Sequence, residues 1–167
     1  YSIIDGSILK RVSAYYQSGI LYALQFNYKN GIITRKIKEG ANDKDISVPV
    51  TVIENWEGTF ATNSVSMIRT STQRIWKYIE SVTNDPITNT AFISSSKLVT
   101  HVEILEGNAD FTEGVSFTSM QRIFKDESGD KLYTYTLNYE GNITLADTDI
   151  TNRDPSGNIF LTSIVKS

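Results

Sequence analysis

The sequence predicts an all-β fold, and two observations lead to that prediction. Its 167 residues include 18 Ser, 18 Thr and nine Tyr but only three Pro, and Thr and Tyr suit the half-solvated faces of sheets. Short runs that alternate apolar and polar residues recur along the chain, separated by clusters of Gly, Asn, Asp and Ser. The chain is 40% hydrophobic and 21% charged, as in a single globular domain, so we expect one β domain over residues 1–167.

The first strands are predicted on either side of an Asn-Gly pair. After a strand over Leu9–Tyr15, the segments Tyr22–Tyr28 and Ile32–Ile37 carry apolar residues in a strand-like pattern. Asn30-Gly31 between them tolerates the positive φ angles of a type I′ turn. The sequence therefore predicts a tight hairpin at Asn30-Gly31.

The segment Ser71–Val82 fits two structures. Ile75, Ile79 and Val82 are spaced as on one face of a helix, with Ser71 as a cap. Against the helix, Thr70–Lys77 resembles Thr118–Lys125, which runs into a hairpin turn. We therefore expect at most one short helix in the chain, near Ser71–Val82.

A second hairpin is predicted from Arg122–Lys125, through a turn at Asp126–Asp130, to Lys131–Tyr139. The returning strand would place its three tyrosines and Leu137 on one face. That tyrosine face is the expected core face.

Strand-and-loop units recur three times in the first 118 residues, at intervals of about 40 to 50 residues. The predicted strands that open the second and third units are Val52–Phe60 and Leu98–Ile104. Such a repeat favours several sheets over one meandering sheet, and we expect a Greek-key β-prism or a β-sandwich.

Composition also excludes several function classes. There is no Cys and only one His, His101, so thiol nucleophiles and Cys- or His-rich metal clusters are absent. The net charge of −3 offers no basic surface for nucleic acid. No Gly-rich phosphate loop or dinucleotide fingerprint occurs, and no apolar stretch is long enough to span a membrane. We expect a protein that is not an enzyme and uses no cofactor.

Two segments resemble the opening of a jacalin-related lectin: Asp5–Val12, and Gly19–Tyr28 leading into Asn30-Gly31. The segment Glu54–Phe60, followed by Ser66–Thr70, is similar to that family's second Greek key. The resemblance covers about residues 5–118. It implies a β-prism that binds sugars.

The resemblance also implies a sugar site. In the family, a Gly-x-x-x-Asp loop holds the sugar, and its nearest match here is Gly107, Asn108, Ala109, Asp110 and Phe111, one residue shorter between Gly and Asp. Asp110 would accept hydrogen bonds from sugar hydroxyls, and Phe111 would line the site. The family's Asp is replaced by Tyr22 in the first repeat and by Asn63 in the second.

Other residues that could carry chemistry are more simply explained by structure. Acidic residues of two predicted turns could hold calcium, but turns carry such residues routinely; we predict no metal site. His101 is expected to be a structural histidine, and Trp56 and Trp76 to pack in or beside the core. The acidic residues are Asp126, Glu127 and Asp130 in the first turn, and Asp147, Asp149 and Asp154 in the second.

Two functions therefore remain open. One is a carbohydrate-binding, lectin-like recognition domain of a secreted or surface protein, with Gly107, Asn108, Asp110 and Phe111 at its ligand site. The alternative is a self-assembling structural subunit of a phage tail tube, a virion or an extracellular filament. Either function predicts an extracellular or virion-associated homo-oligomer whose partners are glycans or identical subunits.

Overall fold

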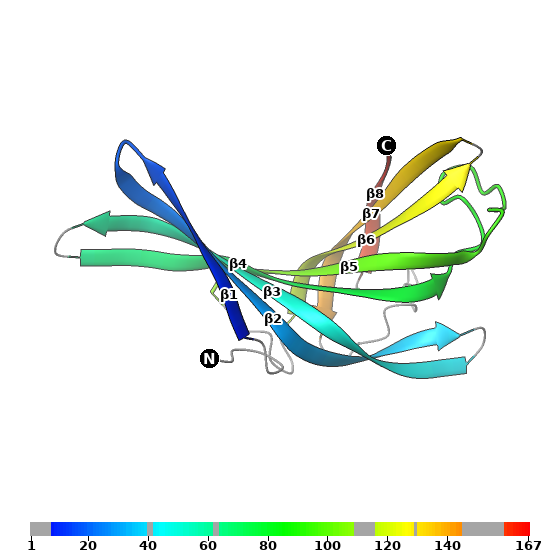
Figure 1. Cartoon of the computed structure of the whole chain (residues 1–167), viewed down its shortest axis with the longest axis horizontal. Helices are drawn as coiled ribbons and strands as arrows, with labels where there is room; N and C mark the ends of the chain where they lie inside the picture. The colour runs from blue at the N-terminus through cyan, green and yellow to red at the C-terminus, as the bar shows by residue number, and fades with distance from the viewer. Residues whose placement is uncertain (1–7, 40–41, 62–63, 109–115, 129, 145–158) are drawn as a thin grey trace.

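A computed structural model describes residues 8–39, 42–61, 64–108, 116–128, 130–144 and 159–167 (Figure 1). They form one antiparallel sheet in which every strand pairs with its neighbours in sequence, in the order β1 to β8. The all-β prediction is confirmed, and no described residue is helical. The strands are β1 (Ile8–Gln17), β2 (Ile20–Glu39), β3 (Asn42–Ala61), β4 (Ser64–Ser81), β5 (Ser96–Glu106), β6 (Ser116–Ser128), β7 (Lys131–Thr144) and β8 (Ile159–Lys166).

This strand order corrects the finer topology expected from the sequence. A Greek-key β-prism or a two-sheet sandwich needs connections that skip a strand, whereas the described strands form a meander. The echo between Thr70–Lys77 and Thr118–Lys125 arises because both segments lie in strands beside β5. It marks similar places in one sheet and not repeated sheets.

The long strands separate toward their ends, so the sheet divides into hairpins (Figure 1). β3 pairs with β4 only as far as Thr51 opposite Ile75. β5 pairs with β6 only between Thr100 opposite Ile123 and Ile104 opposite Ser119. Beyond those residues the β2–β3, β4–β5 and β6–β7 hairpins follow different directions.

One face of the sheet, here called the core face, carries the buried side chains. Alternate residues of β5 show the pattern: Lys97, Val99, His101, Glu103 and Leu105 are all buried. The long β2–β3 hairpin adds to the same core. The apolar core cluster comprises Tyr28, Ile33, Val50, Val52, Trp76, Tyr78, Val99, Leu105, Met120, Phe124, Tyr135, Leu137 and Tyr139.

Ion pairs cross the core face between neighbouring or nearby strands. Buried charges are tolerated when each is paired and hydrogen-bonded, and here most charges lie within the core itself. The pairs are Glu54 with Arg69, Arg74 with Glu103, Lys97 with Asp126, and Glu80 with Arg122.

The opposite face, here called the outer face, is half-exposed and mixes amide, hydroxyl and aliphatic side chains. Two rows of hydrogen-bonded side chains run across it. Gln25, Asn55 and Ser71 form one row across β2, β3 and β4. Gln121, Asn138 and Ser163 form the other across β6, β7 and β8, so the pattern repeats at two places on one sheet.

The hairpin predicted at Asn30-Gly31 is wrong. β2 runs straight through this pair, and the register shifts between Tyr28 and Gly31, which makes the Asn-Gly pair part of a β-bulge. The tight turn lies earlier, where Ser18 and Gly19 have φ angles of 52° and 76°, both positive as a type I′ turn requires. Asn-Gly permits a turn, but here the partner strand β3 is long enough to continue the ladder.

The other two structural predictions have clear outcomes. Residues 71–81 of the ambiguous segment belong to β4, so the short helix near Ser71–Val82 is absent. The second hairpin is confirmed, although β6 and β7 extend to Ser128 opposite Lys131 and the turn is tighter than expected. Tyr135 and Tyr139 are buried on the predicted tyrosine face.

Candidate functional site

The predicted sugar loop follows β5 directly. Gly107 has a φ of 87° with open space where a side chain would lie, and its N–H donates to the Thr70 carbonyl over 2.7 Å. Asn108 beside it is exposed. Asp110 and Phe111 lie outside the described residues, so the structure brings together only half of the predicted site.

The acidic residues considered for calcium do not form a cluster in the described residues. Asp126 is buried and paired with Lys97, whereas Glu127 and Asp130 are exposed. The described parts of the chain contain no group of three acidic, His or Cys side chains placed to hold a metal ion. Asp147, Asp149 and Asp154, like Asn63, lie outside the described residues.

His101 and both tryptophans occupy the structural positions expected of them. His101 is fully buried, with its ring 4.2 Å from that of Trp76 between centroids. Trp56 is half-buried, makes an edge contact with Phe26, and has the Arg69 guanidinium 5.9 Å from its ring centre. Tyr22 is exposed on the β1–β2 hairpin.

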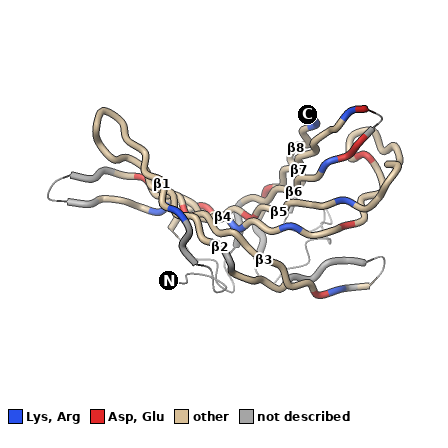
Figure 2. Tube along the Cα trace, viewed as in Figure 1, with Lys and Arg blue, Asp and Glu red and all other residues tan. Residues whose placement is uncertain are grey.

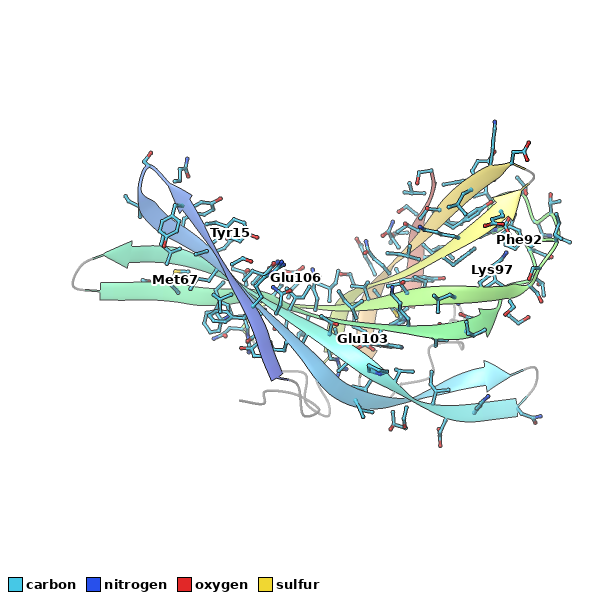
Figure 3. The ribbon with its side chains drawn as sticks, in the orientation of Figure 1. Tyr15, Met67, Phe92, Lys97, Glu103 and Glu106 are labelled. Carbon is cyan, nitrogen blue, oxygen red and sulfur yellow. The ribbon has the colours of Figure 1, made fainter. Side chains whose placement is uncertain are left out.

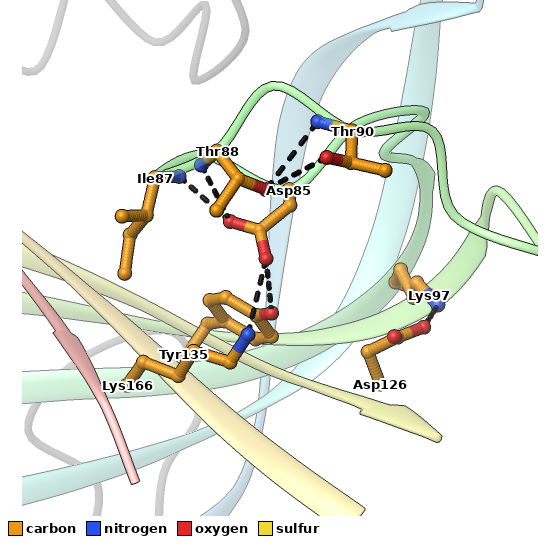
Figure 4. A network of polar contacts seen from close by, with 8 residues as sticks. All are labelled: Asp85, Ile87, Thr88, Thr90, Lys97, Asp126, Tyr135 and Lys166. Atoms are coloured by element: carbon orange, nitrogen blue, oxygen red, sulfur yellow. Dashed lines mark hydrogen bonds and ion pairs between the residues drawn. The ribbon is translucent and has the colours of Figure 1, made fainter. Parts of the chain in front are cut away.

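The connection between β4 and β5 folds onto the core face, and Asp85 holds it there (Figure 4). One carboxylate oxygen accepts the backbone N–H groups of Ile87 at 2.7 Å and Thr88 at 3.1 Å. The other accepts the Tyr135 hydroxyl at 2.6 Å and the Lys166 ammonium at 3.2 Å. Asp85 therefore joins this connection to β7 and β8.

These contacts shift the ionisation of all three side chains. Burial by itself raises the pKa of Asp85, but the hydrogen bonds from Tyr135, Ile87, Thr88 and Lys166 outweigh it and hold the pKa well below 3.8. Burial and the bond to Asp85 raise the pKa of Tyr135 above 10.0. Interaction with Tyr135, then with Asp85, raises the pKa of Lys166.

Asp85 is accordingly a structural anchor. Its four hydrogen bonds use both carboxylate oxygens, and the depressed pKa makes it a poor proton acceptor. Phe92, from the same connection, packs edge-on against Phe124 and Tyr135. The network keeps the connection in place and leaves no reactive group exposed in it.

A groove opens where β5 and β6 separate. It has a volume of about 650 Å³ and is lined from β5 by Ser96, Lys97 and Leu98 and from β6 by residues 125–127. The ion pair between Lys97 and Asp126 joins the two strands on the core face. Lys97 also lies 4.5 Å from the ring centre of Phe92, and both lie at the same end of the sheet (Figure 3).

A second, more polar hollow of about 280 Å³ lies over the β6–β8 row. Within it the Gln121 amide donates to Asn138 at 2.8 Å, and the Asn138 amide donates to Ser163 at 3.0 Å. The exposed Glu140 carboxylate also lines the hollow. Neutral donors and acceptors beside a carboxylate can bind hydroxyl groups.

Sequence reasoning missed both the groove and the hollow. The polar row had a readable signal, because Asn138 was assigned to the face opposite the tyrosines of β7. The groove had none, since it arises where two paired strands separate, and residue pattern does not record where a ladder stops.

Comparisons of the chain with protein-family models, curated proteins and solved structures find no match.

Proposed function

We propose that this chain is a structural subunit that assembles with copies of itself. The observation that carries the proposal is the open sheet, which buries one face and leaves large apolar side chains exposed on its outer face and on its hairpins. Extended exposed apolar surfaces are characteristic of interaction sites. No described residue belongs to a helix that could cross a membrane.

The β1–β2 hairpin has the most aromatic of these surfaces. Tyr16 is 64% exposed and Ile20 54%, on either side of the Ser18-Gly19 turn. Tyr15, labelled in Figure 3, and Tyr22 are also exposed on this hairpin. Tyrosine is enriched at protein interfaces because it combines apolar area with a hydroxyl group.

Edge strands support the same proposal. Among the described strands, β1 and β8 each pair on one side only. Leu161 and Val165 on β8 are about half-exposed, and neither is charged. An unpaired edge with exposed apolar residues can add a strand from another chain.

Sedimentation and electron microscopy test the proposal. We expect the purified chain to form oligomers whose mass rises with concentration, and a Tyr16→Ser/Ile20→Ser variant to assemble less while melting at nearly the same temperature. Ile87→Ser, at a similarly exposed aliphatic position in the β4–β5 connection, is the control. A monomer at all concentrations would refute self-assembly.

Carbohydrate binding is the second candidate, favoured by the hollow over Gln121, Asn138 and Ser163. Sugar hydroxyls both donate and accept, as do the groups in this row. A glycan array with wild type, Asn138→Ala and Asp110→Ala would separate the two sites. Loss of binding in Asn138→Ala alone assigns the hollow, loss in Asp110→Ala alone assigns the predicted loop, and a wild type that binds no glycan removes this candidate.

A further inference from the structure

The groove between β5 and β6 exposes a strand edge in the interior of the sheet. The β5–β6 ladder stops at Thr100 opposite Ile123, yet both strands continue, β5 paired with β4 and β6 paired with β7. Continuing the register would place Leu98 opposite Lys125 and Ser96 opposite Glu127. In the described structure these residues face a groove of about 650 Å³ instead.

The hydrogen-bond alternation shows which backbone groups point into this groove. The N–H of Val82 donates to the carbonyl of Ser95, and that of Gly107 to Thr70. Both bonds follow the β4–β5 register, so odd-numbered residues of β5 bond to β4 and even-numbered ones point toward β6. On β6 the corresponding residues are odd-numbered, and Lys125 and Glu127 therefore turn their N–H and C=O groups into the groove.

The side chains on this edge of β6 restrict what can pair with it. Lys125 and Glu127 are both exposed and lie two residues apart on one face of the strand. An antiparallel partner with matching charges needs a basic residue followed, two positions later, by an acidic one. In this sequence the pattern occurs once, in Lys125-Asp126-Glu127 itself.

The matching segment is therefore the same edge in a second copy of the chain. Acidic and basic residues lie close together at this end of the β6–β7 hairpin (Figure 2). Two antiparallel copies of residues 125–127, related by a twofold axis at Asp126, place each Lys125 opposite the other copy's Glu127. Leu98 and Leu132, both 56% exposed, line the same groove and can be covered by the partner.

We infer that two copies pair through this edge of β6, with a ladder between Lys125 of one copy and Glu127 of the other. This inference rests on the proposed self-assembly and names the contact that begins it. The pairing satisfies backbone groups that the chain's own β5 leaves open, and it adds two ion pairs per dimer.

Charge exchange tests the register directly. Lys125→Glu and Glu127→Lys each replace both intermolecular ion pairs with like-charge contacts, and we expect each to raise the dimer dissociation constant at least tenfold in sedimentation equilibrium. The double variant Lys125→Glu/Glu127→Lys restores opposite charges across the twofold axis and should recover wild-type association. Lys77→Glu, an exposed lysine on the outer face of β4, is the control and should have little effect.

Amide hydrogen exchange gives a second readout, on the backbone. The N–H groups of Lys125 and Glu127 should exchange rapidly at low concentration and become protected as dimers form. If the wild type assembles but the single variants assemble equally well, or these amides stay unprotected, the β6 pairing is wrong and self-assembly stands. If the double variant stays weakened like the single variants, the register is wrong. A wild type that remains monomeric refutes both.

Discussion

Arg74 and Glu103 lie opposite each other in the β4–β5 ladder and form an ion pair inside the core. Nε and Nη2 of the arginine donate to the same carboxylate oxygen at 3.1 and 2.8 Å, and both residues are at least 97% buried. His101, also on β5, is 3.9 Å from the other oxygen of Glu103. The centre of the sheet is thus held by polar contacts within an apolar surround.

Removing one member of this pair should destabilise the protein strongly. Glu103→Leu leaves the arginine buried without its carboxylate, and we expect a loss of about 3–5 kcal/mol. The double variant Arg74→Leu/Glu103→Leu removes both charges and should recover part of that loss. Urea unfolding of the three proteins measures this; a double variant less stable than Glu103→Leu would contradict the explanation.

The Asp85 anchor should be sensitive to the loss of a single hydroxyl. Tyr135→Phe keeps the ring contacts with Phe92 and Phe124 but removes the hydrogen bond to the carboxylate. We expect a loss of about 1.5–3 kcal/mol, as for hydrogen bonds to charged groups. Tyr133→Phe, with a half-buried ring on the same strand, is the control in thermal melts and should change stability less.

The same anchor predicts a pH dependence at both ends of the scale. Because folding lowers the pKa of Asp85, its contribution is present above about pH 4 and is lost as the pH falls toward its folded pKa. Folding raises the pKa values of Tyr135 and Lys166, so their contributions are present below about pH 10 and are lost above it. Asp85→Asn should flatten the acid side of the stability curve; an unchanged acid slope would exclude this role.

Gly58 should not tolerate a side chain. Its φ is 150°, and an added Cβ would overlap the backbone carbonyl of Ser66 on β4. We expect Gly58→Ala to destabilise the protein by about 3 kcal/mol, because backbone must move. Gly19→Ala, at a φ of 76° with no atom nearby, carries conformational strain alone and should cost about 1 kcal/mol. Equal losses in denaturant titrations would show that crowding at Ser66 is not the cause.

Alternation predicted faces well and topology poorly. The tyrosine face of β7 was predictable because burial on one side of a strand imposes a period of two residues. The path through Asn30-Gly31 was not, since a bulge and a turn use the same residues and long-range pairing with β3 decides between them. Nor was Asp85, whose hydrogen-bond partners Tyr135 and Lys166 lie 50 and 81 residues away.

The meander also has a consequence for how the chain folds during synthesis. Each ladder joins strands that are consecutive in sequence, so every new strand meets a template already made, and the sheet can grow in the order of translation. The bond from Lys166 to Asp85 cannot form in that way, because the last strand must reach back to the connection before β5. That bond closes late, and the β4–β5 connection should remain accessible to proteases until β8 is in place.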